Sequence, residues 1–288
     1  MTALLDEGQV SALLRGIDIP PCPDILLQLD AELRKESPDQ RAMATLISRD
    51  VALAGQIMLV VNSPAFSTGR RIDSIIHAIT VLGMRQMFNV VVTQLLKAAL
   101  SGPQAVAMER FWEDSALNAR VSTELARRLR CLKPEMAYTF GLFHDCGIPL
   151  LMRRFPNYQE VLDEASASEH ESLSTVEEAR LGTHHAVVGY FLARRWNLPE
   201  FVVQGILLHH DYSVLDGTTD ALPEAQAAIA VNALAEHIIR LHARVGQENE
   251  WRKAAKPVGA FLGMAEQDVA DVIDDMLDWV ESRESVPG

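Results

Sequence analysis

The stretch Phe140-Gly-Leu-Phe-His-Asp-Cys-Gly147 places His144 and Asp145 side by side at the end of an apolar, helix-forming segment, shortly before a glycine. Adjacent residues of a helix point about 100° apart, so both side chains can reach one metal ion only at a helix end or a distortion. A single His-Asp pair is a weak signal by itself. It predicts a metal site only if further ligands converge on it.

A second cluster, His184-His185, lies further along the chain. It is expected to open a helix over 184–196, with Thr183 as the N-cap. The helical period turns His185 toward the apolar face of this helix and leaves His184 at its edge.

The third cluster, His209-His210, ends a helix expected over 199–210. A histidine taken alone is more often a structural core residue than a ligand. Three clusters on the inner faces of successive helices, however, favour a mononuclear or dinuclear site. Imidazole and carboxylate ligands suit iron, manganese and zinc.

The rest of the chain shows helical periodicity almost throughout and no clear strand pattern. We therefore predict an all-α fold, a multi-helix bundle. Further helices are expected over 24–35, 39–48, about 50–61, about 74–83, 85–100, 111–130, 134–146, 223–243 and 266–281. The polar segment 155–182, with a short helix at 157–165, is either a lid or an ordinary surface connection, and the latter is favoured.

Composition limits the function. The 288 residues include 26 basic and 39 acidic side chains, a formal net charge of −13, which disfavours nonspecific binding to phosphate backbones. Cys22, Cys131 and Cys146 offer no disulfide framework and suit a reducing compartment. The sequence shows no signal peptide and no membrane-spanning run, so we expect a soluble, cytoplasmic protein without a membrane partner.

Four short motifs in the N-terminal half can each be explained as helix starts and stops: Ile19-Pro-Pro-Cys-Pro23, Leu46-Ile-Ser-Arg-Asp50, Val61-Asn-Ser-Pro-Ala-Phe66 and Ile72-Asp-Ser-Ile-Ile-His-Ala-Ile79. Their order, followed by the histidine clusters, resembles the HDOD family, the HD-related output domains of the HD superfamily. The resemblance covers about 15–245. It implies an N-terminal helical part at 15–101, an HD-like part at 108–245 packed on it, and a C-terminal helical extension at 246–288.

The resemblance also implies a set of metal ligands. HD hydrolases hold their metal with a His, then a His-Asp pair, then a later Asp, and dinuclear members add histidines between these. His144 and Asp145 match the pair, whereas His185, His209 and His210 match the added histidines.

Two positions depart from that pattern. The family's first histidine falls at Asp114, which is expected to face inward and to act as a harder, charged ligand. The last aspartate falls at Asn232, which offers only a carbonyl oxygen. The predicted metal ligands are therefore His144, Asp145, His185, His209, His210 and Asp114.

A hydrolytic site needs a firmly held cation, and these departures weaken it. The Gly-Tyr-Pro element of the cyclic-dinucleotide hydrolases is also absent after Asp211. We therefore expect a non-catalytic or weakly catalytic regulatory output module of bacterial type that binds a signalling protein or a small-molecule ligand, with a divalent metal either bound or absent.

The alternative is a metal-dependent phosphohydrolase acting on a nucleotide or a phosphodiester. It requires a basic residue near the phosphate, and Lys133 and Arg180 are the nearest candidates in sequence. The apolar stripe of the last helix either closes the core, which is the favoured role, or mediates a homodimer.

Overall fold

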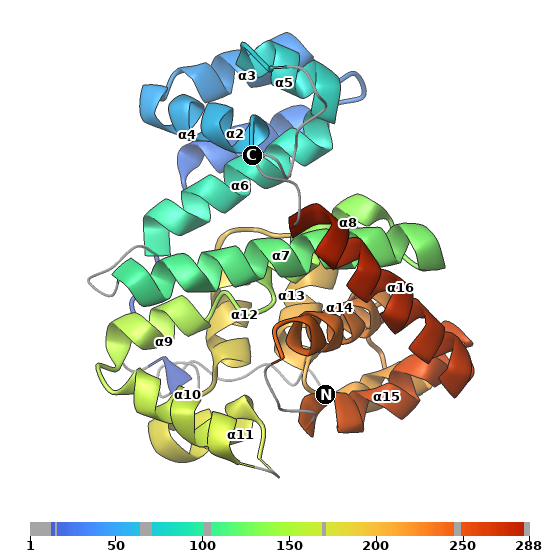
Figure 1. Ribbon diagram of the computed structural model, residues 1–288. Coiled ribbons are helices and arrows are strands. Elements are labelled where there is room, and N and C mark those ends of the chain that lie inside the picture. Colours follow the sequence, from blue (N-terminus) through green and yellow to red (C-terminus); the bar gives the residue numbers. More distant parts are fainter. Residues whose placement is uncertain are drawn as a thin grey trace. The chain divides into compact units, whose positions relative to one another are not determined.

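The computed structural model describes residues 13–14, 16–63, 71–100, 105–168, 171–244 and 249–284. All regular elements within these ranges are helices, which confirms the predicted all-α class. The helices form two compact units (Figure 1). We call them the N-terminal unit, built from α2–α6, and the C-terminal unit, built from α7–α16.

The helices of the N-terminal unit lie close to where the sequence predicts them. They are α2 (Asp24–Leu33), α3 (Gln40–Ser48), α4 (Val51–Val61), α5 (Ile75–Leu82) and α6 (Met84–Leu100). Side-chain caps explain three of the starts, those of α3, α4 and α5, and Asp39 Oδ1 accepts the Arg41 N–H at 2.8 Å before α3. Asp50 Oδ1 accepts the Leu53 N–H at 3.0 Å before α4, and Ser74 Oγ accepts the His77 N–H at 3.3 Å before α5.

Asn62 joins the end of α4 to the segment that precedes α5. Its Nδ2 donates to the carbonyl oxygens of Met58 and Ile72, each at 2.9 Å, and its Oδ1 accepts the Ile72 N–H at 2.9 Å. The motif that begins at Val61 thus fixes a chain reversal in this unit, although its residues 64–66 lie outside the described ranges.

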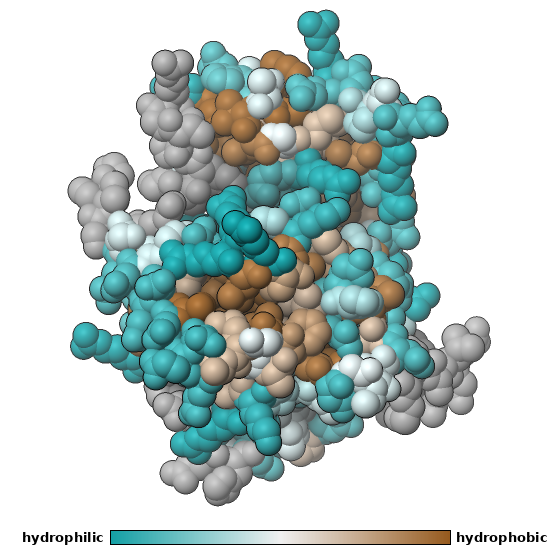
Figure 2. All heavy atoms as spheres, turned by 90° about the vertical axis from the view of Figure 1, so that its right-hand side faces the viewer, coloured by the Kyte–Doolittle hydropathy of each residue, from teal (hydrophilic) through white to brown (hydrophobic). Residues whose placement is uncertain are grey.

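The interior of the N-terminal unit is aliphatic, and all five helices contribute to it. Its buried members include Leu29, Met43, Ile47, Leu53, Ile57, Val61, Ile72, Ile75, Ile79, Met87, Val90 and Val91. Large apolar side chains also reach the surface of this unit, above all Val51 and Leu59 of α4, which are 83% and 76% exposed. Figure 2 shows brown apolar patches between teal polar side chains on one face of the molecule.

Among the described helices, none is by itself long and apolar enough to cross a bilayer. Only α3 and α4 taken together satisfy the length and composition test, and the two are bent by 117° relative to one another.

Replacing Gly55 with alanine is expected to stabilise the protein by about 0.5–1 kcal/mol, because glycine inside a helix loses more backbone entropy than alanine. Gly55 lies in the interior of α4, and an added Cβ would meet no atom within 4 Å. Urea denaturation of the variant beside the wild type measures the change. A loss of stability would show that this face of α4 is covered in solution.

The C-terminal unit is arranged around one central helix. Its elements are α7 (Ala105–Leu129), α8 (Pro134–Phe143), α9 (Ile148–Arg154), α10 (Tyr158–Ala167), α11 (Leu173–Leu181), α12 (His185–Arg195), α13 (Glu200–Leu208), the 3-10 helix η1 (Tyr212–Asp216), α14 (Pro223–His242), α15 (Asn249–Leu262) and α16 (Glu266–Glu284). α14 contacts α7, α8, α13, α15, α16 and η1. Its alanine-rich stretch 225–235 is buried throughout, because small side chains let neighbours approach on several sides.

Three helices of this unit were not predicted, namely α9, α11 and α15. α11 buries only Val176 and Glu177, so it has no apolar stripe to reveal it. α15 contains Pro257, a residue that usually marks a helix end. The last helix, α16, buries Val269, Met276 and Val280 and contacts α7 and α14, so its stripe closes the core of the unit.

Candidate metal centre

Three chain segments bring the predicted histidines and Asp145 together. His144 and Asp145 lie in the turn between α8 and α9. Because the helix ends there, both side chains can reach one centre. His185 is the first residue of α12, and His209 and His210 directly follow α13. The predicted convergence of these five residues in one interior region is what the structure shows.

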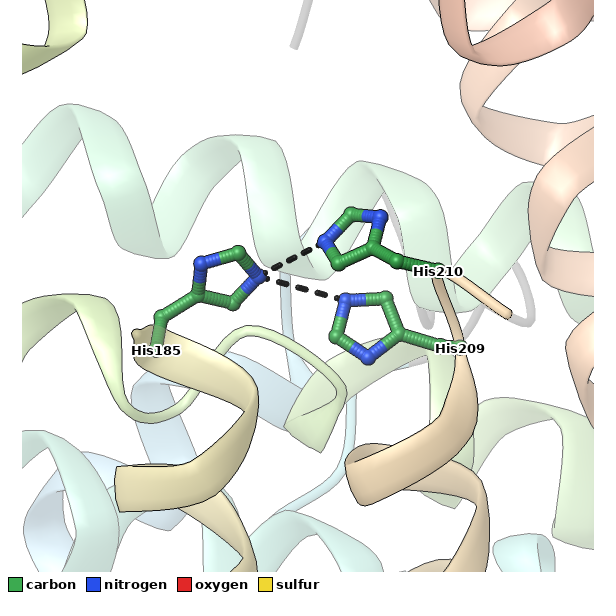
Figure 3. Close-up of side chains that lie close together, drawn as sticks. All are labelled: His185, His209 and His210. Carbon is green, nitrogen blue, oxygen red and sulfur yellow. Dashed lines mark hydrogen bonds between the residues drawn. The ribbon is translucent and has the colours of Figure 1, made fainter. Parts of the chain in front are cut away.

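The side chains form two groups that could each hold a metal ion. In the first, the Nε2 of His185 lies 3.3 Å from that of His209 and 2.9 Å from that of His210 (Figure 3). In the second, the Nε2 of His144 lies 2.9 Å from Glu236 Oε1 and 3.1 Å from Asp145 Oδ2. Within each group all the ligand atoms lie within 4.8 Å of one another.

Asp145 connects the two groups. Its Oδ2 faces His144, whereas its Oδ1 lies 3.3 Å from the Nε2 of His185 and 3.4 Å from that of His209. One carboxylate of the second group therefore faces three imidazoles, one in its own group and two in the first, so it would help to hold a cation in this region.

Two of the four imidazoles are oriented by their own helices. The Nδ1 of His144 donates to the Gly141 carbonyl oxygen at 3.0 Å, and the Nδ1 of His209 donates to the Ile206 carbonyl oxygen at 2.7 Å. A carbonyl oxygen can only accept, so the proton is on Nδ1 and Nε2 is turned toward Asp145.

The other two imidazoles are oriented by carboxylates. The Nδ1 of His185 donates to Glu177 Oε2 at 2.5 Å, and the Nδ1 of His210 donates to Glu250 Oε2 at 3.4 Å. All four rings thus direct Nδ1 to an outer acceptor and Nε2 to the centre, as metal-ligating histidines do. This donor set fits a divalent transition metal.

The carboxylates Glu236, Glu177 and Glu250 were missed by the sequence analysis. Glu236 had a detectable signal, because it follows Asn232 by one helical turn and shares its face. Glu177 lies in the segment 155–182, for which a surface connection was favoured, and that interpretation is wrong at this residue, since Glu177 is fully buried. No spacing pointed to Glu250, which belongs to the unpredicted helix α15.

Asp114 does not join the centre. The prediction that it faces inward is wrong: its side chain is exposed on α7. The buried face of α7 carries Ser115, Asn118 and Ser122, so the apolar pattern alone misplaced the inner side of this helix.

Asn232 is buried and already bonded. Its Oδ1 accepts from the Nδ2 of Asn118 at 2.7 Å, and the same Nδ2 donates to the Gly141 carbonyl oxygen at 3.1 Å. A neutral amide therefore stands beside His144, where the resemblance implied the family's last aspartate, and the Oδ1 of Asn118 is buried with no hydrogen-bond partner among the described residues.

The start of α12 also differs from the prediction. His184, not Thr183, is the N-cap, and the Thr183 hydroxyl is buried with no hydrogen-bond partner among the described residues. Instead, Glu177 Oε2 accepts the backbone N–H of His185 at 3.0 Å. One carboxylate thus caps the helix and orients the first ligand on it.

The buried charges shift the pKa of the histidines in opposite directions. Burial lowers the pKa of His144, but the charges and hydrogen bonds of Asp145 and Glu236 outweigh it and raise the pKa to about 10. The same balance, with Glu177 as the main partner, raises the pKa of His185 to about 9. For His209, burial and the neighbouring His210 lower the pKa to about 4.

In the presence of a chelator, the free energy of unfolding is expected to fall as the pH rises from 6.5 toward 10. The folded-state pKa values of His144 and His185 exceed the usual 6.5, so the stabilisation they supply is complete below pH 6.5 and is lost through pH 9 and 10. His209 titrates below this window.

Urea denaturation at a series of pH values measures this trend. Added cation should reverse it, because metal binds the deprotonated imidazole. A stability that is independent of pH in chelator would contradict the raised pKa values of His144 and His185.

Comparison with known proteins agrees with this geometry. The family model of the HDOD domain matches residues 19–212, which is more than half of the chain. The chain belongs to the HDOD family. The helices α14, α15 and α16 all lie beyond the match.

Solved structures share the fold of this HDOD protein. An HDOD domain protein of unknown function from Geobacter sulfurreducens is 27% identical, with a TM-score of 0.70 over 94% of both chains. A proposed signal transduction protein from Marinobacter aquaeolei VT8 is 20% identical, with a TM-score of 0.74 over 96% of this chain and 63% of its own. A proposed phosphohydrolase from Shewanella amazonensis SB2B is 22% identical, with a TM-score of 0.69 over 92% of this chain and 94% of its own.

An uncharacterized protein of Treponema pallidum is 26% identical over 196 residues. The aligned region is 67% of this HDOD chain but only 38% of the relative. The chain therefore spans well under half of that longer protein.

Proposed function

We propose that this protein is a regulatory output module whose C-terminal unit binds a divalent cation and which acts by binding a partner protein or a small ligand, with little or no turnover. The observation that carries the proposal is the hydrogen bond between Asn118 and Asn232 beside His144. The neutral amide of Asn232 stands where the resemblance places the last aspartate of the hydrolases, and it accepts this bond from Asn118.

The charge around the centre supports binding over phosphate chemistry. The partly exposed side chains of the centre are mainly acidic, with Asp145 24% and Glu236 22% exposed. Carboxylates at the opening attract a cation and repel a phosphate that approaches without one.

The two basic residues suggested from the sequence do not supply a phosphate site. Arg180 is engaged with Glu164, with Nη2 and Oε2 2.5 Å apart. Lys133 is the N-cap of α8, whereas His144 follows the opposite end of that helix.

A phosphohydrolase is the second candidate, and one observation favours it. Asp145 of the second group also lies within 3.4 Å of His185 and His209 of the first, and Glu236 adds a carboxylate that the sequence analysis had not counted. A bound cation would supply an activated water and charge neutralisation. The residues of this chain would orient the cation through the four imidazoles described above.

Metal analysis and an activity screen separate the two functions. The protein, purified without chelator, is analysed for iron, manganese and zinc and then assayed against nucleotides and phosphodiesters with added Mn²⁺ or Fe²⁺. Stoichiometric cation without turnover supports the regulatory module. Turnover that Asp145→Ala abolishes supports the hydrolase, and a protein that binds no added cation refutes the metal centre.

A further inference from the structure

The two ligand groups differ in what orients their imidazoles. His144 is oriented by Gly141 of its own helix, and His209 by Ile206 of its own helix. His185 and His210 depend on carboxylates from other elements, Glu177 of α11 and Glu250 of α15. The His185–His209–His210 group is therefore connected to peripheral helices, whereas the His144 ring is not.

Glu177 is the strongest of these connections. It is fully buried and accepts from three donors: the Nδ1 of His185, the backbone N–H of His185, and the hydroxyl of Tyr158. Tyr158 opens α10, so this single carboxylate joins α10, α11 and the first ligand of α12. Val176 is the only other buried residue of α11, and an exposed ion pair between Arg180 and Glu164 joins this helix to α10.

The start of α15 completes the connection. Asn249 Nδ2 donates to the Ser168 carbonyl oxygen at 2.8 Å, at the C-cap of α10, and the next residue, Glu250, accepts from His210. We call α10, α11 and the residues Asn249 and Glu250 the clamp. Figure 1 shows α10 and α11 together at one border of the C-terminal unit.

We propose that the clamp sets the cation affinity of the His185–His209–His210 group and that cation binding there, in turn, orders α10 and α11. The inference rests on the proposed cation binding and adds how occupancy would be regulated. A cation at Nε2 requires one ring orientation, and Glu177 holds that orientation through Nδ1. This coupling is reciprocal. A partner that displaces α11 weakens cation binding by some factor, and the bound cation weakens the binding of that partner by the same factor.

Selectivity between the groups distinguishes the clamp from a general stabilising contact. The His144–Asp145–Glu236 group has no ring anchored by α10, α11 or α15. Loss of the clamp should therefore weaken one cation position and leave the other.

The variant Glu177→Gln tests this prediction, with Glu178→Gln as the matched control. Glu178 is the next residue of α11, its side chain is 65% exposed, and its nearest histidine nitrogen, on His184, is 3.7 Å away. Co²⁺ is titrated into each protein, and binding is followed by calorimetry and by the visible absorption of the bound ion. We expect Glu177→Gln to weaken one cobalt position by about 10–100-fold, as loss of an outer-shell partner does, and Glu178→Gln to bind as the wild type.

Hydrogen exchange supplies a second readout, which begins with the wild type. Cobalt should slow amide exchange in α10 and α11 of the wild type, and Glu177→Gln should lose this protection at equal cobalt concentration. Tyr158→Phe keeps the carboxylate and removes one donor, so it should give an intermediate effect if the glutamine variant does not fold.

The outcomes separate this inference from the proposed function. If the wild type binds no cobalt, the metal centre and the clamp are both refuted. If cobalt binds but exchange in α10 and α11 does not change, or Glu177→Gln binds both ions as the wild type does, the clamp is refuted while the metal centre stands.

Discussion

Replacing Asp145 with alanine should lower cation affinity at both ligand groups by at least about 100-fold. Loss of an outer-shell partner alone weakens metal binding by about 10–100-fold, whereas Asp145 is a ligand candidate of one group and its carboxylate also faces two imidazoles of the other. Its oxygens lie 3.1–3.4 Å from the Nε2 atoms of His144, His185 and His209. Calorimetric titration with Mn²⁺ or Co²⁺ and metal analysis of the purified variant measure the loss.

Asp211→Ala is the matched control for this prediction. Asp211 is a nearby exposed carboxylate after His210, and its Oδ1 accepts the Ser213 N–H at 3.1 Å rather than facing the centre. The control should retain cation binding. If Asp145→Ala binds cations as tightly as Asp211→Ala, the centre is not where the geometry places it.

Gly147→Ala should destabilise the protein by about 3 kcal/mol or more and displace the ligand at the start of α12. An alanine Cβ at this position would lie 2.0 Å from the backbone oxygen of His185 and 2.8 Å from the backbone nitrogen of Gly189. Overpacking of a core costs about 1–3 kcal/mol and more where the contact is with backbone that cannot move aside. Urea denaturation gives the stability, and a cation titration reports on His185.

Gly55→Ala provides the comparison, because the same chemical change there is expected to stabilise. Gly147 has a φ of −75°, which any residue adopts, so the requirement for glycine comes from the close approach of α12 and not from backbone strain. A Gly147→Ala protein as stable as the wild type would show that the turn after α8 and the start of α12 are further apart than described.

The helices that the sequence predicted correctly share one property, a strong local signal. α4 and α5 have capping side chains at Asp50 and Ser74 and an aliphatic stripe, so local hydrogen bonds and periodicity suffice to locate them. α11 and α15 escaped prediction because α11 is mostly polar and α15 contains Pro257. Both helices exist because neighbouring elements hold them.

The candidate site divides in the same way. His144 and His185 were assigned to the interior from the end of one helix and the stripe of another, and the structure places them there. Asp114 was assigned by the same reasoning and is exposed, because the inner face of α7 carries polar side chains that the apolar pattern does not count.

From the sequence alone, the all-α class and the family resemblance could be established and the histidine-aspartate ligand set could be predicted, because periodicity, caps and clustered ligands are properties of short segments. Only the tertiary structure decided that Glu236, Glu177 and Glu250 surround those ligands, and that Asn118 donates to Asn232 beside them. The physical reason is that these partners come from different helices. Which side chains meet is determined by how the helices cross and in which register they pack, and no local pattern encodes that.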